Sequence, residues 1–216
     1  MIVAAVGLQR EARLLATAGV TFVIGGGHST GLRRKLGAVA GQATGLISIG
    51  IAGALAHDLR SGDWIVADSV IGGTRRTATD PAWTRRLADA LSARTGTSYA
   101  GDRPLTEAAT KTAMHAETGA IAADMESHVV ADIAREYGRP FAVARVVADR
   151  ADQDLPPAAL VGMRPDGSMN LPAVLRSLLA RPAQLPALIA TGIAAERAFR
   201  ALSRLPRDLL AIPPEP

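Results

Sequence analysis

The sequence contains no cysteine, and only two of its 24 basic residues are lysines, Lys35 and Lys111. The absence of cysteine excludes disulfides, thiolate catalysis and cysteine-based metal sites, and it fits a reducing compartment. Aromatic residues make up only 3% of the chain, so the core must be built mainly from alanine, leucine, valine and isoleucine. No uncharged apolar run reaches the roughly 18 residues that a membrane span needs. We therefore predict a soluble, globular protein.

The charge balance is +4, and the basic residues are almost entirely arginines. A basic chain raises the question of a nucleic-acid partner. The arginines, however, occur as scattered pairs, with few aromatic residues between them on which bases could stack. This pattern favours solvated, arginine-rich surfaces, and we expect no nucleic-acid partner.

At 216 residues the chain suits one domain, which we place at residues 1–216 with a helical tail over 171–216. The N-terminus reads MIVAAVGLQREARLL and has no basic region before its apolar run. This stretch indicates a first strand rather than a signal peptide. We expect a cytoplasmic protein, with a tail helix that either caps the sheet or touches the inner face of the membrane peripherally.

Short apolar runs alternate with helical patterns along the chain. The runs are continuous rather than alternating, which is typical of strands buried on both faces. The pattern therefore predicts an α/β fold with a mixed, mostly parallel central sheet flanked by helices. Strands are expected at residues 2–6, 21–24, 46–49, 62–71, 120–123 and 140–148, and helices at 10–17, 81–94 and 171–203, the last broken at Pro182 and Pro186.

Glycines and carboxylates follow several of these strands. In open parallel sheets, ligands bind at the carboxyl ends of the strands. Two carboxylates in Asp124–Ser127 lie where the chain should enter the core, and we infer that they face a ligand. The segments that follow the strands are Gly7–Glu11, Gly25–Gly27, Gly50–Gly53, Asp124–Ser127 and Asp149–Asp154.

Four motifs occur in a characteristic order: SIGIAGAL (48–55), SGDWIVAD (61–68), ADMES (123–127) and ARVVADRAD (144–152). Together they resemble the purine nucleoside phosphorylase and methylthioadenosine nucleosidase superfamily. The DMESH motif (124–128) and the C-terminal sequence from Leu155 further resemble the hopanoid-associated phosphorylases, which are thought to remove adenine from adenosylhopane. The resemblance implies phosphorolysis of an adenine nucleoside by a homo-oligomer, with inorganic phosphate as co-substrate and neither a metal nor an organic cofactor.

The resemblance also implies roles for individual residues. Asp149 matches the acid that serves the purine, and a buried carboxyl group has the raised pKa that protonating a leaving base requires. Glu126 and Met125 match the residues that hold the ribose, while Leu105 lies where the base is bordered. Glu11 lies where nucleosidases keep a water-orienting glutamate. Each acid also has an ordinary interpretation, as a turn cap, a first-turn helix acid or a helix-face partner of arginine.

The nucleophile is left open between phosphate and water. Phosphate needs backbone amides at a helix start and a guanidinium. Where the hexameric phosphorylases have an arginine and, three residues on, a serine, this chain has Ser48 and Ile51, and Ile51 is not expected to donate to an anion. The candidate residues for phosphate or water are Gly26, Gly27, Arg33, Ser48 and Gly50.

Two rival functions remain beside phosphorolysis. One is a hydrolytic nucleosidase that acts on methylthioadenosine-like or adenosylhomocysteine-like nucleosides, and the other is a module that binds a nucleoside without cleaving it. The wider family has a hairpin between the second and third strands, and this chain lacks it. We expect its absence to open the site for a bulky 5′ substituent. This shortening favours a lipid-linked nucleoside over a small thioether.

Overall fold

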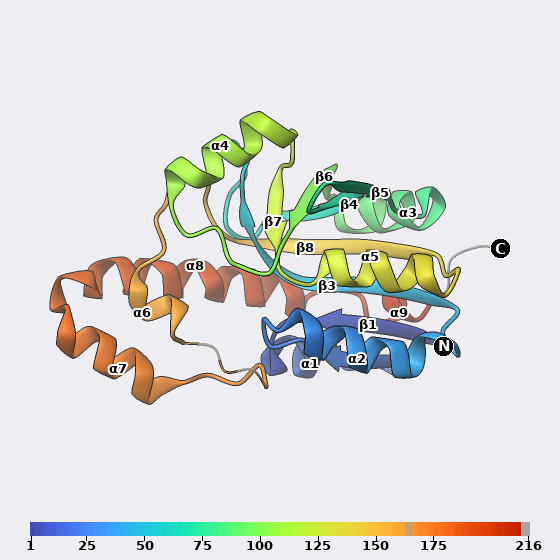
Figure 1. Cartoon of the computed structure of the whole chain (residues 1–216), viewed down its shortest axis with the longest axis horizontal. Coiled ribbons are helices and arrows are strands. Elements are labelled where there is room, and N and C mark those ends of the chain that lie inside the picture. The colour runs from blue at the N-terminus through green and yellow to red at the C-terminus, as the bar shows by residue number, and fades with distance from the viewer. Residues whose placement is uncertain (163, 165, 213–216) are drawn as a thin grey trace.

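The computed structural model describes residues 1–162, 164 and 166–212. An eight-stranded mixed sheet lies at the centre, and helices cover both of its faces (Figure 1). The predicted α/β class, with a mixed and mostly parallel sheet, is confirmed. The strands are β1 (Ile2–Val6), β2 (Val20–Ile24), β3 (Gly45–Ala54), β4 (Trp64–Gly72), β5 (Arg75–Ala78), β6 (Arg94–Ala100), β7 (Ala122–Asp124) and β8 (Phe141–Asp149).

The helices lie between the strands and form the C-terminal part of the chain. Helices α2 and α5 pack together on one face of the sheet, whereas α1 and the second half of α8 pack on the other (Figure 1). The helices are α1 (Gln9–Leu15), α2 (Ser29–Ala40), α3 (Pro81–Leu91), α4 (Ala108–Thr118), α5 (Ser127–Glu136), α6 (Pro157–Leu160), α7 (Leu171–Ala180), the 3-10 helix η1 (Pro182–Gln184), α8 (Leu185–Ser203) and α9 (Arg207–Ala211).

Part of the sheet closes on itself. Strand β3 pairs with both β7 and β8, β7 pairs with β6, β6 with β4, and β4 with β8. These five strands form a closed ring of pairings, which leaves none of them with a free edge along its whole length. Strands β1 and β2 extend the sheet from β3, and β5 is a short hairpin partner of β4.

The register between β3 and β8 places glycines opposite charged residues. Gly50 pairs with Arg145, and Gly53 pairs with Asp149. Because Ala52 pairs with Val147, β8 contains one more residue than β3 over this stretch, which makes a β-bulge. Gly50 and Gly53 have no side chain, so the charged groups on β8 can lie against the backbone of β3.

Several predicted elements have different boundaries in the structure. The helix predicted through Arg94 ends at Leu91, because Ser92 adopts a left-handed conformation with φ of 48°. Arg94 instead begins β6, whose sequence RTGTSYA lacks the apolar run on which strand prediction depended. Pro186 lies in the first turn of α8 and therefore starts that helix rather than breaking it.

Candidate active site

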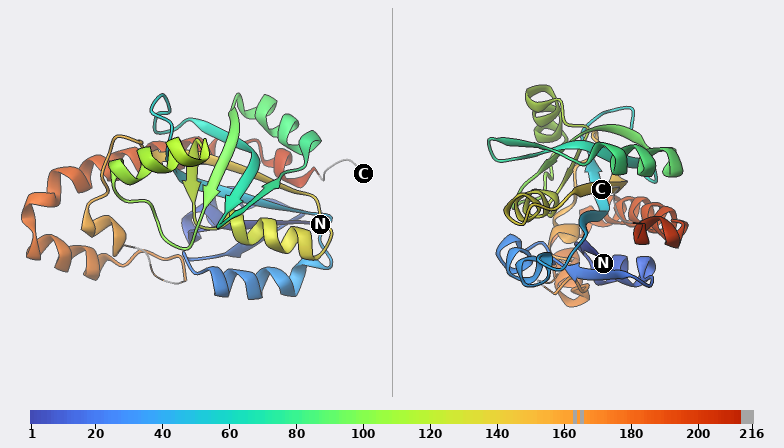
Figure 2. Two further views of the ribbon diagram at one scale, coloured as in Figure 1. Left: turned by 45° about the horizontal axis from the view of Figure 1, so that its top comes forward. Right: turned by 90° about the vertical axis from the view of Figure 1, so that its right-hand side faces the viewer.

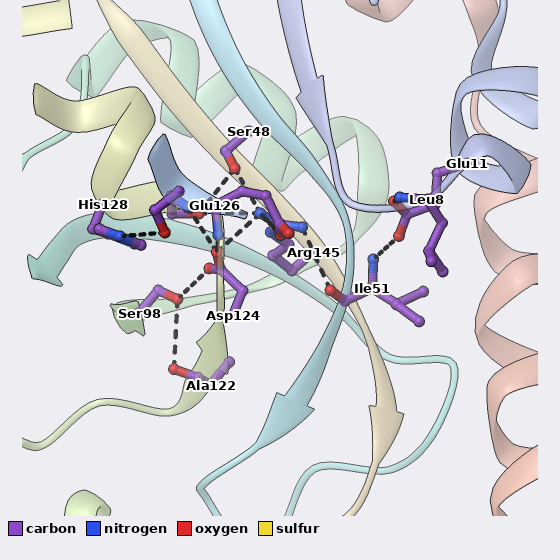
Figure 3. Close-up of polar contacts among 12 residues, drawn as sticks. Leu8, Glu11, Ser48, Ile51, Ser98, Ala122, Asp124, Glu126, His128 and Arg145 are labelled. Carbon is purple, nitrogen blue, oxygen red and sulfur yellow. Dashed lines mark hydrogen bonds and ion pairs between the residues drawn. The ribbon is translucent and has the colours of Figure 1, made fainter. Parts of the chain in front are cut away.

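Arg145 lies at the centre of the polar residues at the strand ends. Its side chain comes from the middle of β8 and is 1% exposed. The Nη2 group donates to Asp124 Oδ1 at 2.9 Å and to Glu126 Oε2 at 3.2 Å (Figure 3). It also donates to Ser48 Oγ at 2.6 Å. A buried cation with two carboxylate partners binds them in a fixed arrangement, because leaving either charge unpaired in this environment would be costly.

Glu11 joins the same group from the other side. Its carboxylate accepts the backbone N–H of Leu8 and the backbone N–H of Ile51, each at 2.8 Å (Figure 3). The Ile51 side chain has no donor, yet its backbone N–H does donate to an anion, contrary to the sequence-based expectation. Burial raises the pKa of Glu11, and the nearby charge of Arg145 partly opposes this rise. We call Glu11, Asp124, Glu126 and Arg145 the carboxylate cluster.

Asp124 holds the start of α5 in place. Its Oδ1 accepts the backbone N–H groups of Glu126 at 2.9 Å and Ser127 at 2.7 Å, as expected of a capping residue. Ser98 Oγ donates to its other oxygen at 3.2 Å. Asp124 therefore fixes the backbone that presents Glu126, in addition to its ion pair with Arg145.

The acidity of Glu126 is shifted strongly toward neutrality. Its pKa is raised to about 7: burial is the largest cause, the charge of Arg145 opposes the rise, and the charges of Asp124 and Glu11 add to it. A carboxyl group with this pKa exchanges its proton near neutrality, which is the range that acid–base and electrostatic catalysis require.

This raised pKa predicts a pH-dependent stability. The folded state keeps the Glu126 proton up to about pH 7, whereas the unfolded chain loses it near pH 4.5. Between these values the folded state binds more protons, so the Glu126 contribution to the free energy of unfolding falls as pH rises, by about 3 kcal/mol, and is flat above pH 7. Glu11 and Asp149 also have raised pKa values, so both proteins should show some slope, and denaturant titrations should find it smaller in Glu126→Gln than in the wild type. Equal slopes would contradict the prediction.

Asp149 ends β8 and forms a second buried ion pair. Lys111, from α4, donates to Asp149 Oδ2 at 2.6 Å, and the Lys111 side chain is 1% exposed. The same ammonium group donates to the carbonyl oxygens of Arg150 at 3.0 Å and Gln153 at 2.8 Å. All three Lys111 donors are thus used. Burial raises the pKa of Asp149, and Lys111 partly opposes the rise.

Glycines occupy the positions where these carboxylates approach the backbone. A Cβ atom at Gly50 would lie 2.5 Å from Glu11 Oε1, and one at Gly53 would lie 3.0 Å from Asp149 Oδ2. At Gly7, a Cβ atom would lie 3.0 Å from an oxygen of Glu126. Gly7 follows β1 as predicted, whereas Gly50 and Gly53 lie inside β3, which continues to Ala54 beyond its predicted end at Ile49. At all three positions the missing side chain makes room for an acid.

The other residues predicted from the sequence are placed as follows. Met125 is half-buried between Asp124 and Glu126. Leu105 is half-buried in the loop after β6, and the next residue, Thr106, accepts the Leu155 N–H at 2.8 Å in the segment that follows β8. This bond holds the loop that contains Leu105 close to the chain that follows Asp149.

The residues predicted for phosphate or water are divided. Ser48 is buried within the carboxylate cluster, and Gly50 lies against Glu11. Gly26 donates its N–H to the Gly7 carbonyl at 3.0 Å, and Gly27 follows it in the turn before α2. Arg33 points elsewhere: its guanidinium pairs with Asp132 at 2.7 Å and Glu136 at 3.5 Å on the outer side of α5.

Arg145 and Lys111 were not singled out in the sequence. The signal for Arg145 was a lone charge inside the otherwise apolar run PFAVARVVA. The sequence signal for Lys111 was weaker, because a lysine in the helical stretch AATKTAMHAET is ordinarily exposed. Across residues 1–162, 164 and 166–212, no group of three or more histidine, aspartate or glutamate side chains is arranged to hold a metal ion.

Comparisons with known proteins agree with this architecture. A family model described as the phosphorylase superfamily matches residues 8–180. In the comparison with curated proteins, none matches the sequence significantly. Among solved structures, the chain is similar to the 5′-methylthioadenosine/S-adenosylhomocysteine nucleosidase of Helicobacter pylori, with a TM-score of 0.64 at 16% identity over 93% of this chain and 95% of that one.

Two further structures show the same likeness. Futalosine hydrolase of Helicobacter pylori has a TM-score of 0.63 at 16% identity, covering 93% of this chain and 94% of that one. S-adenosylhomocysteine nucleosidase of Streptococcus pyogenes has a TM-score of 0.63 at 18% identity, covering 95% and 97%. At these identities the likeness concerns the fold.

Proposed function

The chain belongs to the phosphorylase superfamily, and on that premise we propose that it is an enzyme that cleaves the N-glycosidic bond of an adenine nucleoside and releases adenine. The observation that carries the proposal is the carboxylate cluster, in which one buried guanidinium, Arg145, binds Asp124 and Glu126 at the strand ends. A further buried acid, Asp149, ends β8, the strand that carries Arg145. Glu126 suits the ribose, which becomes positively charged in the reaction, and Asp149 suits the purine, which leaves.

The chemistry requires charge to move in opposite directions. As the bond between the sugar C1′ and the purine N9 breaks, its electron pair leaves with the base, and positive charge develops on the ribose. We assign Glu126 and Met125 to the ribose: Met125 packs against the sugar, and the Glu126 carboxylate stabilises the positive charge. We assign Asp149 to the purine, which Leu105 would border, and Asp149 supplies the hydrogen bond or proton that N7 gains. Lys111 orients Asp149 by holding its Oδ2 atom.

Water is the nucleophile that the charges favour. A phosphate dianion beside Glu11, Asp124 and Glu126 would meet three carboxyl groups and one guanidinium. Arg33, the cation expected to bind phosphate, is paired with α5. We therefore propose that Glu11 orients a water molecule, takes its proton as the oxygen bonds to C1′, and so makes the reaction a hydrolysis.

Phosphorolysis, which the resemblance implies, is the second candidate. The observation in its favour is the N-terminus of α2, a twelve-residue helix that begins just after Gly27. Backbone N–H groups at such a terminus attract anions. A phosphate bound there would have to reach C1′ past Glu126, whose side chain lies against Gly25.

For the substrate we propose an adenine nucleoside with a large apolar 5′ group, of the adenosylhopane kind. Support comes from the connection between β2 and β3, which consists of α2 alone. The superfamily that the sequence resembles has a hairpin there that walls the 5′ side, and the sequence predicts its absence from this chain. A connection without that hairpin suits a bulky substituent.

Product analysis tests the nucleophile and the activity together. Purified protein is incubated with adenosine-type nucleosides, with and without inorganic phosphate, and the products are separated by chromatography. Adenine with free sugar in both buffers is the expected result. Adenine that requires phosphate and appears with a sugar 1-phosphate would establish phosphorolysis instead. If neither adenosine nor a 5′-alkyl adenosine yields adenine, the proposed function is wrong.

A further inference from the structure

The C-terminal part of the chain forms a projecting arm, which we define as residues 171–193. It consists of α7, η1 and the first half of α8, and it extends from one end of the α/β body (Figures 1 and 2). No residue of α7 is buried, and the buried residues of α8 begin only at Ala194. The second half of α8 packs on the body, so the arm is rigidly continued from a helix whose other end is fixed.

The arm carries half of the twelve large apolar side chains that are exposed on the described surface. On α7 these are Leu171, Leu175 and Leu179, with exposed fractions of 58%, 60% and 83%. On α8 they are Leu185, Ile189 and Ile193, at 47%, 55% and 53%. Within each helix the spacing is four residues, so each set forms one stripe along one helix face. Contiguous exposed apolar surface of this kind marks an interaction site.

The charges on the arm have a single sign. Residues 167–195 include Arg176 and Arg181, both exposed, and no acidic residue or lysine. Surface exposure and positive charge therefore occur together with the two apolar stripes. Apolar stripes with nearby arginines are complementary to a partner that has an apolar layer beneath an anionic surface.

Two hydrogen bonds link the arm and the residues just before it to segments that adjoin the candidate active site. Gln9, which follows β1, donates its backbone N–H to Gly167 O at 3.0 Å, just before α7. Gln153, in the segment after Asp149, donates its side-chain amide to Thr191 Oγ1 on α8 at 3.5 Å. The arm therefore stands beside the strand ends that carry Glu11 and Asp149.

We propose that the arm docks on an anionic lipid bilayer, with its apolar stripes in the interfacial layer and its arginines at the headgroups. Among the described residues no single helix is long and apolar enough to cross a membrane, and α7 and α8 reach that length only as a pair bent by 116°. The arm itself, residues 171–193, contains no acidic residue, and a bent helix pair with an arm of this composition fits a helix hairpin lying in the interface. Docking there would bring the strand ends close to a membrane-dissolved substrate.

A second copy of the chain is the other occupant to consider. Two arms packed on each other would bring arginines together without an acidic partner on either arm. An anionic lipid surface supplies the missing negative charge, so charge complementarity favours the bilayer. The delivery of a lipid-linked nucleoside rests on the proposed function, whereas bilayer binding does not.

Vesicle co-sedimentation of the full chain tests the docking. Vesicles of phosphatidylglycerol and phosphatidylcholine are compared with vesicles of phosphatidylcholine alone at low and high salt. We expect binding to the anionic vesicles that weakens with salt. Replacing Leu175 and Leu179 together with glutamate should lower the partition coefficient at least ten-fold. Arg176→Gln and Arg181→Gln should each lower it about five-fold.

The matched control adds the same two negative charges to an exposed helix outside the arm. Ala82→Glu with Ala90→Glu, on α3, should leave vesicle binding within about two-fold of wild type. Absence of binding to anionic vesicles would overturn the proposal, and so would an equal loss in the control. A dimer in size-exclusion chromatography that the arm variant dissociates, without vesicle binding, would assign the arm to a second copy.

Adenine release from a water-soluble nucleoside separates this inference from the proposed function. We expect the arm variants to release adenine at the wild-type rate, because Leu175 and Leu179 lie outside the site. Intact release without vesicle binding would overturn the docking surface alone. Vesicle binding without adenine release would overturn the proposed function alone.

Discussion

Replacing Arg145 with methionine is expected to lower the free energy of unfolding by about 3–5 kcal/mol. The guanidinium is 1% exposed and pairs with Asp124 and Glu126, while its charge also acts on Glu11. Methionine fills similar space but leaves these carboxylates buried without a cation. Urea titrations monitored by circular dichroism, at pH 8, measure the loss.

Two comparisons make this result specific. Arg33→Met removes an arginine that also pairs with two acids, but Arg33 is 46% exposed, so a loss of at most about 1 kcal/mol is expected. The deficit of Arg145→Met should shrink at pH 5, because the orphaned carboxylates then take up protons. A loss equal to that of Arg33→Met, or one independent of pH, would show that the cluster is not held by this charge.

Replacing Asp149 with asparagine is expected to reduce the rate of adenine release by about 10²–10⁴-fold, because the purine loses its acid. Asparagine keeps the shape of the side chain, so nucleoside binding should change by only a few fold. Steady-state kinetics and calorimetric binding of a nucleoside measure the two effects separately. Asp152→Asn, at an exposed acid paired with Arg150, should change neither.

Lys111 gives this prediction a second test. In Lys111→Met the Asp149 carboxyl group loses its cation, so its pKa rises further. The alkaline limb of the pH–rate profile should therefore move to higher pH, whereas a purely structural lysine would leave the limb in place. If Asp149→Asn retains wild-type turnover, Asp149 is not the group that serves the purine.

The fold could largely be predicted because its buried strands are continuous apolar runs. The ends of β1 and β8 followed closely from those runs, and parallel ends meet at one edge of a sheet. The end of β3 did not, because the strand predicted to end at Ile49 continues through the glycines to Ala54. The strand β6 could not be predicted in this way, because its threonines and serine pair within the sheet without forming an apolar run. Its existence depends on partners, β4 and β7, that are distant in sequence.

The charged centre of the site is harder to predict. The carboxylate partners of Arg145 are the last residue of β7, Asp124, and Glu126 just beyond it, and only the topology of the sheet brings them to Arg145. Arg33 shows the opposite effect. It follows a glycine turn that suggests an anion site, but helix α2 directs its side chain toward α5. Single residues on helices cannot be placed until the neighbouring helix is known.

The bulge between β3 and β8 gives a criterion for recognising related enzymes. Gly50 and Gly53 are three positions apart, whereas their partners Arg145 and Asp149 are four apart, and the extra residue in β8 absorbs the difference. If a chain retains all four residues but alters either spacing by one, its arginine and its acid would no longer both lie opposite the glycines, because successive side chains on a strand point to opposite faces. Alignments of distant relatives should therefore be judged by these paired spacings, and a gap placed inside either strand should count against shared chemistry.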